Sequence, residues 1–193
     1  MTIKIEEKVP SIVPSGKVRI FKIPAGEWDR ANNTSYFDNP VIDKPINNTI
    51  TNEVAEFFVG WLNKEPEYNF THIYGQWGNA SLFPEGGGPY IVPQRDDTVA
   101  DLTPANIFIT DAEVPIINRM KGTQAGQSEF TNNIISVMGV LTKNDTKVYV
   151  GAGLVCEVSS TKKLLLSHVA FDGILKESTH DLLIIWDWIF TNT

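Results

Sequence analysis

The sequence is poor in cysteine and in clustered positive charge. Cys156 is the one cysteine among 193 residues, so no disulfide can form within the chain. Its apolar surroundings, residues 151–158, predict a buried, unreactive thiol, because a reactive cysteine needs a cation or a base beside it. No run of Lys or Arg is longer than two residues, and the formal net charge is -7. Nucleic-acid binding depends on clustered cations, so we expect neither direct nucleic-acid contact nor binding to an anionic membrane.

Long apolar runs are missing as well. No stretch of the sequence approaches the roughly 20 apolar residues that a membrane-spanning helix requires. The first seven residues lack the apolar core of a signal peptide. We therefore expect a protein without a membrane anchor that is made and folded in a cytoplasm.

The patterns of common catalytic, metal and phosphate sites are not found. The sequence has no Gly-X-Ser-X-Gly, no Cys-X-X-Cys and no paired histidines at metal-ligand spacing. The glycines at 86–88 are followed by proline rather than by Lys-Ser/Thr and a helix, which favours a loop hinge over a phosphate cradle. The acidic stretch 96–101 lacks the alternation of a calcium loop. We predict no enzyme activity, no metal and no cofactor, and we interpret His168 as a hydrogen-bonded sheet residue.

One enzymatic alternative stays open, namely cleavage of a cell-wall or surface polysaccharide. Such enzymes use two carboxylates whose separation is set in space, so sequence spacing cannot decide the matter. The acids available for such a pair are Glu113, Glu129, Glu157 and Asp172.

Residues 1–48 are predicted to form an extended N-terminal arm. Prolines interrupt it repeatedly, and each blocks a helix and a central strand. They stand at positions 10, 14, 24, 40 and 45. Between them, residues 17–23 alternate apolar and polar side chains, which predicts one short strand. We expect the rest of the arm to gain order only by lying on its own domain or on a neighbouring subunit.

Residues 49–193 are predicted to form a β-rich domain with one helix at 51–63. Thr51 or Asn52 can cap the start of this helix, and the sequence of residues 63–66 ends it. Apolar residues at helical spacing form a broad stripe, which we expect to pack on a sheet. The stripe consists of Val54, Phe57, Phe58, Trp61 and Leu62.

The remaining extended segments indicate a sheet structure. Short ones are expected at residues 70–78, 107–110 and 114–120. Four longer apolar segments are separated by turn sequences, which predicts an antiparallel meander. They span residues 133–141, 148–158, 164–171 and 182–190. The last is apolar on both faces, so we expect both to be covered, with a partner subunit as one candidate cover. The predicted fold is mainly β, an antiparallel β-sandwich with one packed α-helix and the extended arm.

Four aromatic residues near turns or loops are candidate ligand or interface residues. They are Trp28, Tyr36, Trp77 and Tyr90. A flat exposed ring can stack on a sugar, and Trp77, flanked by glycines at 75 and 78, is the strongest candidate for exposure. Packing of these rings against neighbouring side chains is the competing interpretation, and we favour it.

Three motifs carry a likeness to known proteins. Residues 50–53 read Ile-Thr-Asn-Glu, residues 72–78 read His-Ile-Tyr-Gly-Gln-Trp-Gly, and residues 182–190 read Leu-Leu-Ile-Ile-Trp-Asp-Trp-Ile-Phe. Their order resembles that in a loose family of phage tail, fibre and baseplate-associated structural proteins. Residues 150–156 are similar to a further motif of that family but lack its leading Glu, and residues 111–119 fit a segment with an acid and an Arg. The resemblance covers residues 50–190.

The resemblance implies a structural role in a bacteriophage virion, as a tail, baseplate, neck or fibre-attachment protein. Its partners would be copies of itself and other virion proteins, and it would be made in the host cytoplasm and end up in the particle. No catalytic residues come with the resemblance. The alternative is a glycan- or receptor-binding module of a phage fibre or adhesin, with a surface glycan as its ligand.

Overall fold

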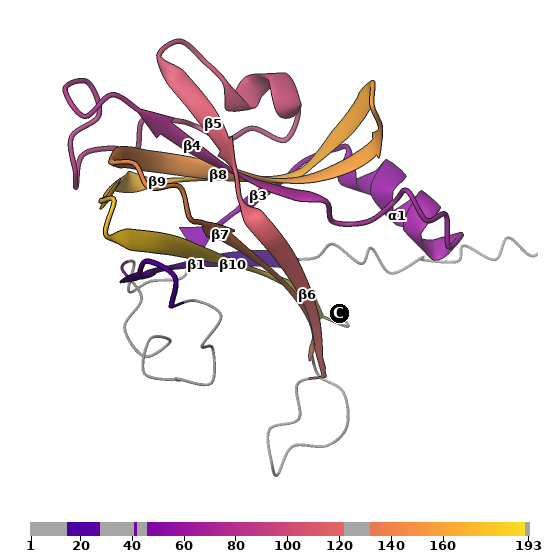
Figure 1. The fold of residues 1–193 in the computed structure, drawn as a ribbon. Helices are drawn as coiled ribbons and strands as arrows, with labels where there is room; N and C mark the ends of the chain where they lie inside the picture. The colour runs from indigo at the N-terminus through magenta and orange to yellow at the C-terminus, as the bar shows by residue number, and fades with distance from the viewer. Residues whose placement is uncertain (1–14, 28–40, 42–45, 122–131, 192–193) are drawn as a thin grey trace, which may run out of the picture.

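Two antiparallel sheets lie face to face in the computed structural model, which describes residues 15–27, 41, 46–121 and 132–191 (Figure 1). Sheet A has the strand order β2 (Ile46–Asn47), β1 (Ser15–Pro24), β10 (His180–Thr191), β7 (Asn132–Leu141) and β6 (Glu113–Lys121). Sheet B has the order β3 (Thr49–Ile50), β9 (Lys162–Lys176), β8 (Lys147–Ser159), β4 (His72–Gly78) and β5 (Ile107–Asp111). The prediction of a mainly β, antiparallel sandwich with one helix is confirmed.

The four long C-terminal strands do not form the predicted meander. β8 and β9 form a hairpin in sheet B, whereas β7 and β10 pair with each other in sheet A. The chain therefore crosses between the sheets at residues 142–146 and again at 177–179. The apolar sequences predicted each strand but not its partner, because a strand in either arrangement turns a face to the core.

Lys176 connects the two crossings. It is the last residue of β9, its side chain is fully buried, and its ammonium donates to the backbone carbonyls of Lys143 and Asp145 in the first crossing. Burial lowers the pKa of Lys176, and the carboxylate of Asp145 acts in the opposite direction. A buried ammonium is tolerated here because acceptor oxygens surround it.

Residues 15–24, which the prolines placed in an arm, are a strand of the sandwich. β1 pairs along its length with β10, from Ser15 opposite Ile189 to Pro24 opposite His180. Its alternate residues Val18 and Ile20 are fully buried in the main core. The strand predicted at 17–23 is thus confirmed, and this segment belongs to the β-rich domain. The other residues of the predicted arm that precede residue 46, except 25–27 and 41, lie outside the described residues.

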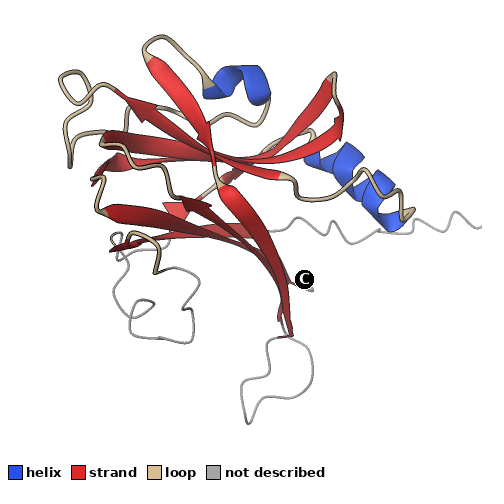
Figure 2. Ribbon diagram, in the orientation of Figure 1, coloured by secondary structure: helices blue, strands red, loops and turns tan. Residues whose placement is uncertain are grey.

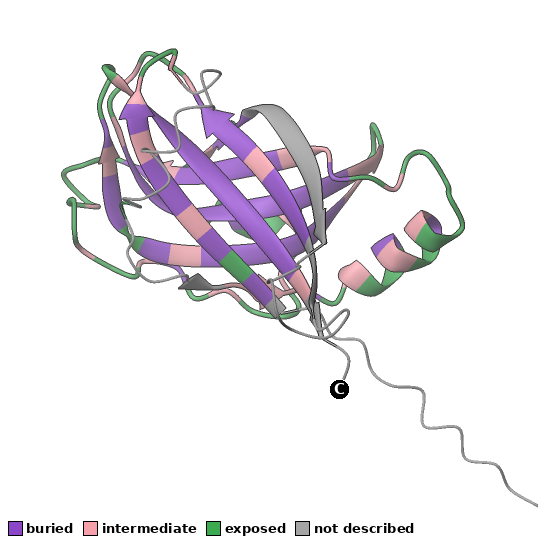
Figure 3. Cartoon of the chain, turned by 90° about the horizontal axis from the view of Figure 1, so that it is seen from below, coloured by how far each residue is buried: buried purple, intermediate pink, exposed green. Residues whose placement is uncertain are grey.

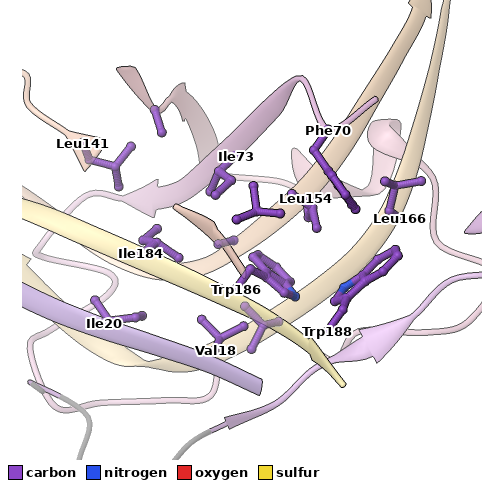
Figure 4. Close-up of a cluster of buried hydrophobic side chains, with 14 of the residues drawn as sticks. Val18, Ile20, Phe70, Ile73, Leu141, Leu154, Leu166, Ile184, Trp186 and Trp188 are labelled. Carbon is purple, nitrogen blue, oxygen red and sulfur yellow. The ribbon is translucent and has the colours of Figure 1, made fainter. Parts of the chain in front are cut away.

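The core between the sheets is built around β10 (Figure 4). Ile184, Trp186 and Trp188 follow one another on the face that looks toward sheet B, and all three are buried. Residues of both sheets and of the loop before β4 pack around them, namely Val18, Ile20, Phe70, Ile73, Leu141, Leu154 and Leu166. The two tryptophans supply much of the volume between the sheets, and large aromatic side chains dominate core energetics.

The opposite face of β10 is covered as well. Leu183 and Ile185 are buried in a second apolar cluster with Phe21, Ile23 and Val140 of the neighbouring strands. The expectation that both faces of the last strand are covered is confirmed. This burial is present in a single chain, so the double-sided apolar pattern does not by itself require a partner subunit.

Three polar residues lie beyond this apolar cluster on the same face of sheet A. The Arg19 guanidinium donates to one carboxylate oxygen of Asp187 at 2.8 and 3.0 Å, and the Ser136 hydroxyl donates to the other at 2.5 Å. The acid in the middle of the last strand is therefore paired by residues of the strands on either side of it.

The predicted helix is α1 (Val54–Leu62), and its start is fixed by sheet B rather than by a side-chain cap. Glu53 occupies the N-cap position without a capping hydrogen bond. The Thr51 hydroxyl donates to the carbonyl of Leu165 in β9, and the Glu53 carboxylate accepts from the amide of Leu165. Thr51, one of the two predicted caps, therefore joins the helix to the sheet instead of capping it, and the helix begins three residues later than the predicted start at residue 51.

Most of the predicted helical stripe packs on the core. Phe57 is fully buried, and its ring lies 5.0 Å from Phe70 and 6.1 Å from Trp188, measured between ring centroids. Leu62, the last residue of the stripe, is instead 75% exposed. Figure 3 shows the reason, since α1 extends away from the strands at one end of the sandwich.

Replacing Ile20 with Ala tests whether β1 is part of the core. Because Ile20 is fully buried, we expect the free energy of unfolding to fall by about 2–5 kcal/mol, measured by chemical denaturation. The matched control is Lys17→Ala, an exposed position on the same strand, which should change stability by no more than about 0.5 kcal/mol. Equal effects of the two substitutions would show that β1 is a detachable arm.

Candidate functional site

The outer face of sheet B, turned away from sheet A, is overlaid by residues 79–106, which we call the cover segment (Figure 2). It contains the 3-10 helix η3 (Val99–Leu102), whose start is closed by reciprocal hydrogen bonds between Thr98 and Asp101. Leu102 is fully buried in a cluster with Tyr74, Val155 and Leu165 of the sheet. The cover segment thus seals an apolar surface that sheet B would otherwise expose.

Two buried polar side chains of the sheet hold the cover segment. Gln76 of β4 is fully buried, and its Nε2 donates to the carbonyl of Leu102 at 2.8 Å. His168 of β9 is 1% exposed, with Nε2 at 2.9 Å from Oε1 of Gln76 and Nδ1 at 2.6 Å from Oδ2 of Asp97. Burial lowers the pKa of His168, while the Asp97 carboxylate acts to raise it. The interpretation of His168 as a hydrogen-bonded sheet residue is confirmed.

A second, more exposed network crosses the same face of sheet B. His72 of β4 contacts Asp111 of β5 and Glu157 of β8, at 2.8 Å from each ring nitrogen. Lys163 of β9 lies 2.9 Å from Glu157 and donates to the Tyr74 hydroxyl at 3.0 Å. These bonds raise the pKa of Lys163, with Tyr74 as the larger cause, and Lys163 and His72 lower the pKa of Glu157. The network links four strands, so its evident role is to tie the sheet together.

Trp77, the strongest ligand candidate of the sequence, is engaged within the chain. Its ring lies 4.9 Å from that of Phe108, its cross-strand neighbour, and the Lys147 ammonium sits 3.9 Å from the ring centroid. Lys147 is itself paired with Asp145 at 2.8 Å. These contacts favour packing over sugar stacking for Trp77.

The exposed ring in this region is Phe108, which sequence reasoning missed. It is 53% exposed, whereas its neighbour Ile107 is buried. The alternation of a strand at 107–110 was a usable signal, because it places Phe108 and Ile107 on opposite faces.

The other three aromatic candidates do not converge with Trp77. Tyr90 packs edge-on against Phe83 at 5.0 Å and lies against Gly87, where any larger residue would collide with its hydroxyl. Trp28 and Tyr36 lie outside the described residues. The described rings of Trp77 and Tyr90 belong to different apolar clusters, so they form no common binding surface.

The structure describes the side chains of two of the four candidate acids for polysaccharide cleavage. Glu157 is bound to His72 and Lys163, and Asp172 is exposed on β9. Glu129 and the side chain of Glu113 lie outside the described part of the chain. Among the described residues, no group of three or more His, Cys, Asp or Glu is arranged to hold a metal ion.

Two further observations bear on function. None of the helices in the described ranges combines the length and the apolar character needed to cross a membrane. No protein-family model, no curated protein and no solved structure matches this chain.

The thiol of Cys156 provides a test of the described burial. The side chain is fully buried, lies 3.5 Å from the carbonyl of Glu67, and has its pKa raised by burial. A thiol reagent should therefore react roughly a hundredfold more slowly with the native chain than with the unfolded chain. The reaction rate of the native chain should also begin to rise at a higher pH than that of free cysteine, because a thiol with a raised pKa forms its thiolate only at higher pH. Reaction at the unfolded rate would contradict the packing of β8.

Proposed function

We propose that this chain is a structural subunit of a bacteriophage particle, in the tail, baseplate, neck or fibre-attachment region, and that it acts through contacts between subunits. The motifs that resemble phage structural proteins occupy the elements on which the fold depends. Residues 50–53 lead into α1, residues 72–78 are β4, and residues 182–190 make up most of β10. Two of the three motifs thus coincide with packed strands, and the third forms the turn that joins β3 to α1.

The observation that carries the proposal is apolar surface at two separate ends of the sandwich. At one end α1 presents a helix patch, in which Val59 is 63% and Leu62 is 75% exposed. Toward the other end, Leu82 is 57% and Phe108 is 53% exposed, and we refer to these two side chains as the loop patch. α1 packs on Phe70, before β4 begins, whereas the loop patch lies beyond and beside the end of β4. A strand of this length separates the two patches by about 20 Å.

Two different apolar patches at opposite ends fit head-to-tail contacts between identical copies, which close into rings or extend as filaments. A standard interface buries about 800 Å² on each partner, which is more than the two leucines and their neighbours supply. Beside the helix patch, a shallow hollow extends the available surface. It is lined by Trp61, Leu62, Lys64, Glu65, Pro66, Tyr68 and Asn69. We assign the helix patch and this hollow to contact with the loop patch of a second copy.

A glycan- or receptor-binding module is the second candidate function. The observation in its favour is the half-exposed ring of Phe108, which lies beside Trp77 and near the ammonium of Lys147. An aromatic ring next to a hydrogen-bond donor is a common arrangement for holding a sugar. This surface overlaps the loop patch, so the two functions make different predictions for the same residues.

Paired substitutions test the head-to-tail contact. Leu62→Glu disables the helix patch and Leu82→Glu the loop patch, so neither variant should associate with itself. A mixture of the two should form dimers, because the intact loop patch of the Leu62→Glu chain can bind the intact helix patch of the Leu82→Glu chain. Sedimentation velocity over a range of concentrations measures this, with Ser178→Glu on the exposed turn before β10 as the charge-matched control.

Several outcomes would count against subunit contacts. They are a wild-type chain that stays monomeric at every concentration, and variants that assemble as the wild type does. Binding of a bacterial surface polysaccharide by a monomer, abolished by Phe108→Ala but retained by Leu62→Glu, would instead support the glycan-binding function. The virion assignment itself is tested by imaging a particle, in which the chain should occupy a fixed, symmetric copy number.

A further inference from the structure

The number of protons on the His168 ring determines which of its contacts are hydrogen bonds. The carbonyl of Leu102 can only accept, so the Gln76 amide must point its Nε2 toward it. Oε1 of Gln76 then faces the His168 ring, and this oxygen can also only accept. On the other side of the ring, Nδ1 meets the carboxylate of Asp97 at 2.6 Å. Both ring nitrogens of His168 therefore face acceptor oxygens.

A neutral imidazole cannot satisfy this arrangement. It carries one N–H, so one of its two contacts would set a nitrogen lone pair against an oxygen lone pair. Rotating the Gln76 amide does not help, because the repulsive contact then moves to the carbonyl of Leu102. All the contacts become hydrogen bonds only when one additional proton is present, on His168 or shared with Asp97. Unmade hydrogen bonds are costly in a site as buried as this one.

We propose that the folded chain keeps this additional proton on the Asp97–His168 pair, and that the protonated pair fastens the cover segment to sheet B until rising pH releases it. The titratable groups that act on the ring are Asp97 directly and Asp101 at longer range, both on the cover segment. Gln76 contributes an uncharged acceptor from β4, and the facing positions of β3 and β8 are Thr49 and Gly153. The negative charges of Asp97 and Asp101 both favour the imidazolium.

Burial has the larger influence on this ring and lowers the pKa of His168, which alone would give the opposite pH dependence. The acceptor oxygens at both ring nitrogens are the geometric reason for assigning the additional proton. A ring that held its proton more tightly in the closed state would stabilise closure at low pH and lose that effect as pH rises through its folded titration midpoint. A ring buried as the neutral form would have to open on acidification. The sign of the pH dependence therefore separates the two possibilities.

Release of the cover segment would expose the apolar cluster of Tyr74, Val155 and Leu165 and the face of sheet B that carries it. The pair would then act as a proton-dependent latch on a surface that is sealed in the closed state. This inference does not depend on the assembly function, because it rests on contacts within one chain.

Amide hydrogen exchange over residues 94–103 tests the latch, expressed as protection factors so that the intrinsic effect of pH on exchange is removed. A histidine changes charge within the range from about pH 5.5 to about pH 8.5. Over this range we expect the protection factors of the segment to fall by about tenfold. His168→Gln should abolish the pH dependence. His180→Gln should leave it unchanged, because His180 begins β10 in sheet A, away from the cover segment. Protection that is independent of pH, or that rises with pH, overturns the proposal.

If His168→Gln does not fold, the titration of His168 can be measured in the unmodified chain instead. The ring nitrogens of His168 can be followed by NMR through a pH titration. We expect the midpoint to lie above the value of about 6.5 for a free histidine. A midpoint below that value would show that the ring is buried as the neutral form and that the latch does not exist.

Discussion

The burial of β10 on both of its faces is the constraint on which the rest of the structure depends. One face places Trp186 and Trp188 between the sheets, and the other places Leu183 and Ile185 in the outer cluster of sheet A. Both edges of the strand are also occupied, by β1 and β7. A strand with both faces and both edges satisfied cannot shift its register by one residue without moving its apolar side chains to the wrong side. It therefore fixes the positions of the neighbouring strands.

The positions of α1 and of the cover segment follow from this arrangement. Trp188 contacts Phe57 and Phe58, which sets α1 at one end of the sandwich and turns Val59 and Leu62 outward. Sheet B packs its inner face on β10 and therefore needs a separate cover for its outer face, which residues 79–106 supply. That cover is held partly by apolar contacts and partly by the buried polar chain through Gln76 and His168. The helix patch and the loop patch lie on the surface, whereas the polar chain through Gln76 and His168 acts within one molecule.

The sequence allowed the local elements to be predicted, because alternation and helical spacing are properties of neighbouring residues. It did not reveal strand partners, since β7 pairs with a strand that begins 39 residues after it ends. The prolines around β1 suggested an arm, although Pro24 only ends a strand whose pairing is long-range. His168 was correctly interpreted as a sheet residue, but its partners Gln76 and Asp97 are 92 and 71 residues away in the sequence. The two end patches were missed for the same reason, because exposure depends on where distant elements stop.

Native-state hydrogen exchange, resolved residue by residue, tests the central position of β10 most directly. If β10 organises the fold, its amides and those of β1 should exchange only through global unfolding, with the same free energy as the central strands of sheet B. Exchange of β1 and β10 at a clearly lower free energy, while β8 and β9 stay protected, would contradict the account. It would show that sheet B is the stable unit and that sheet A is added to it.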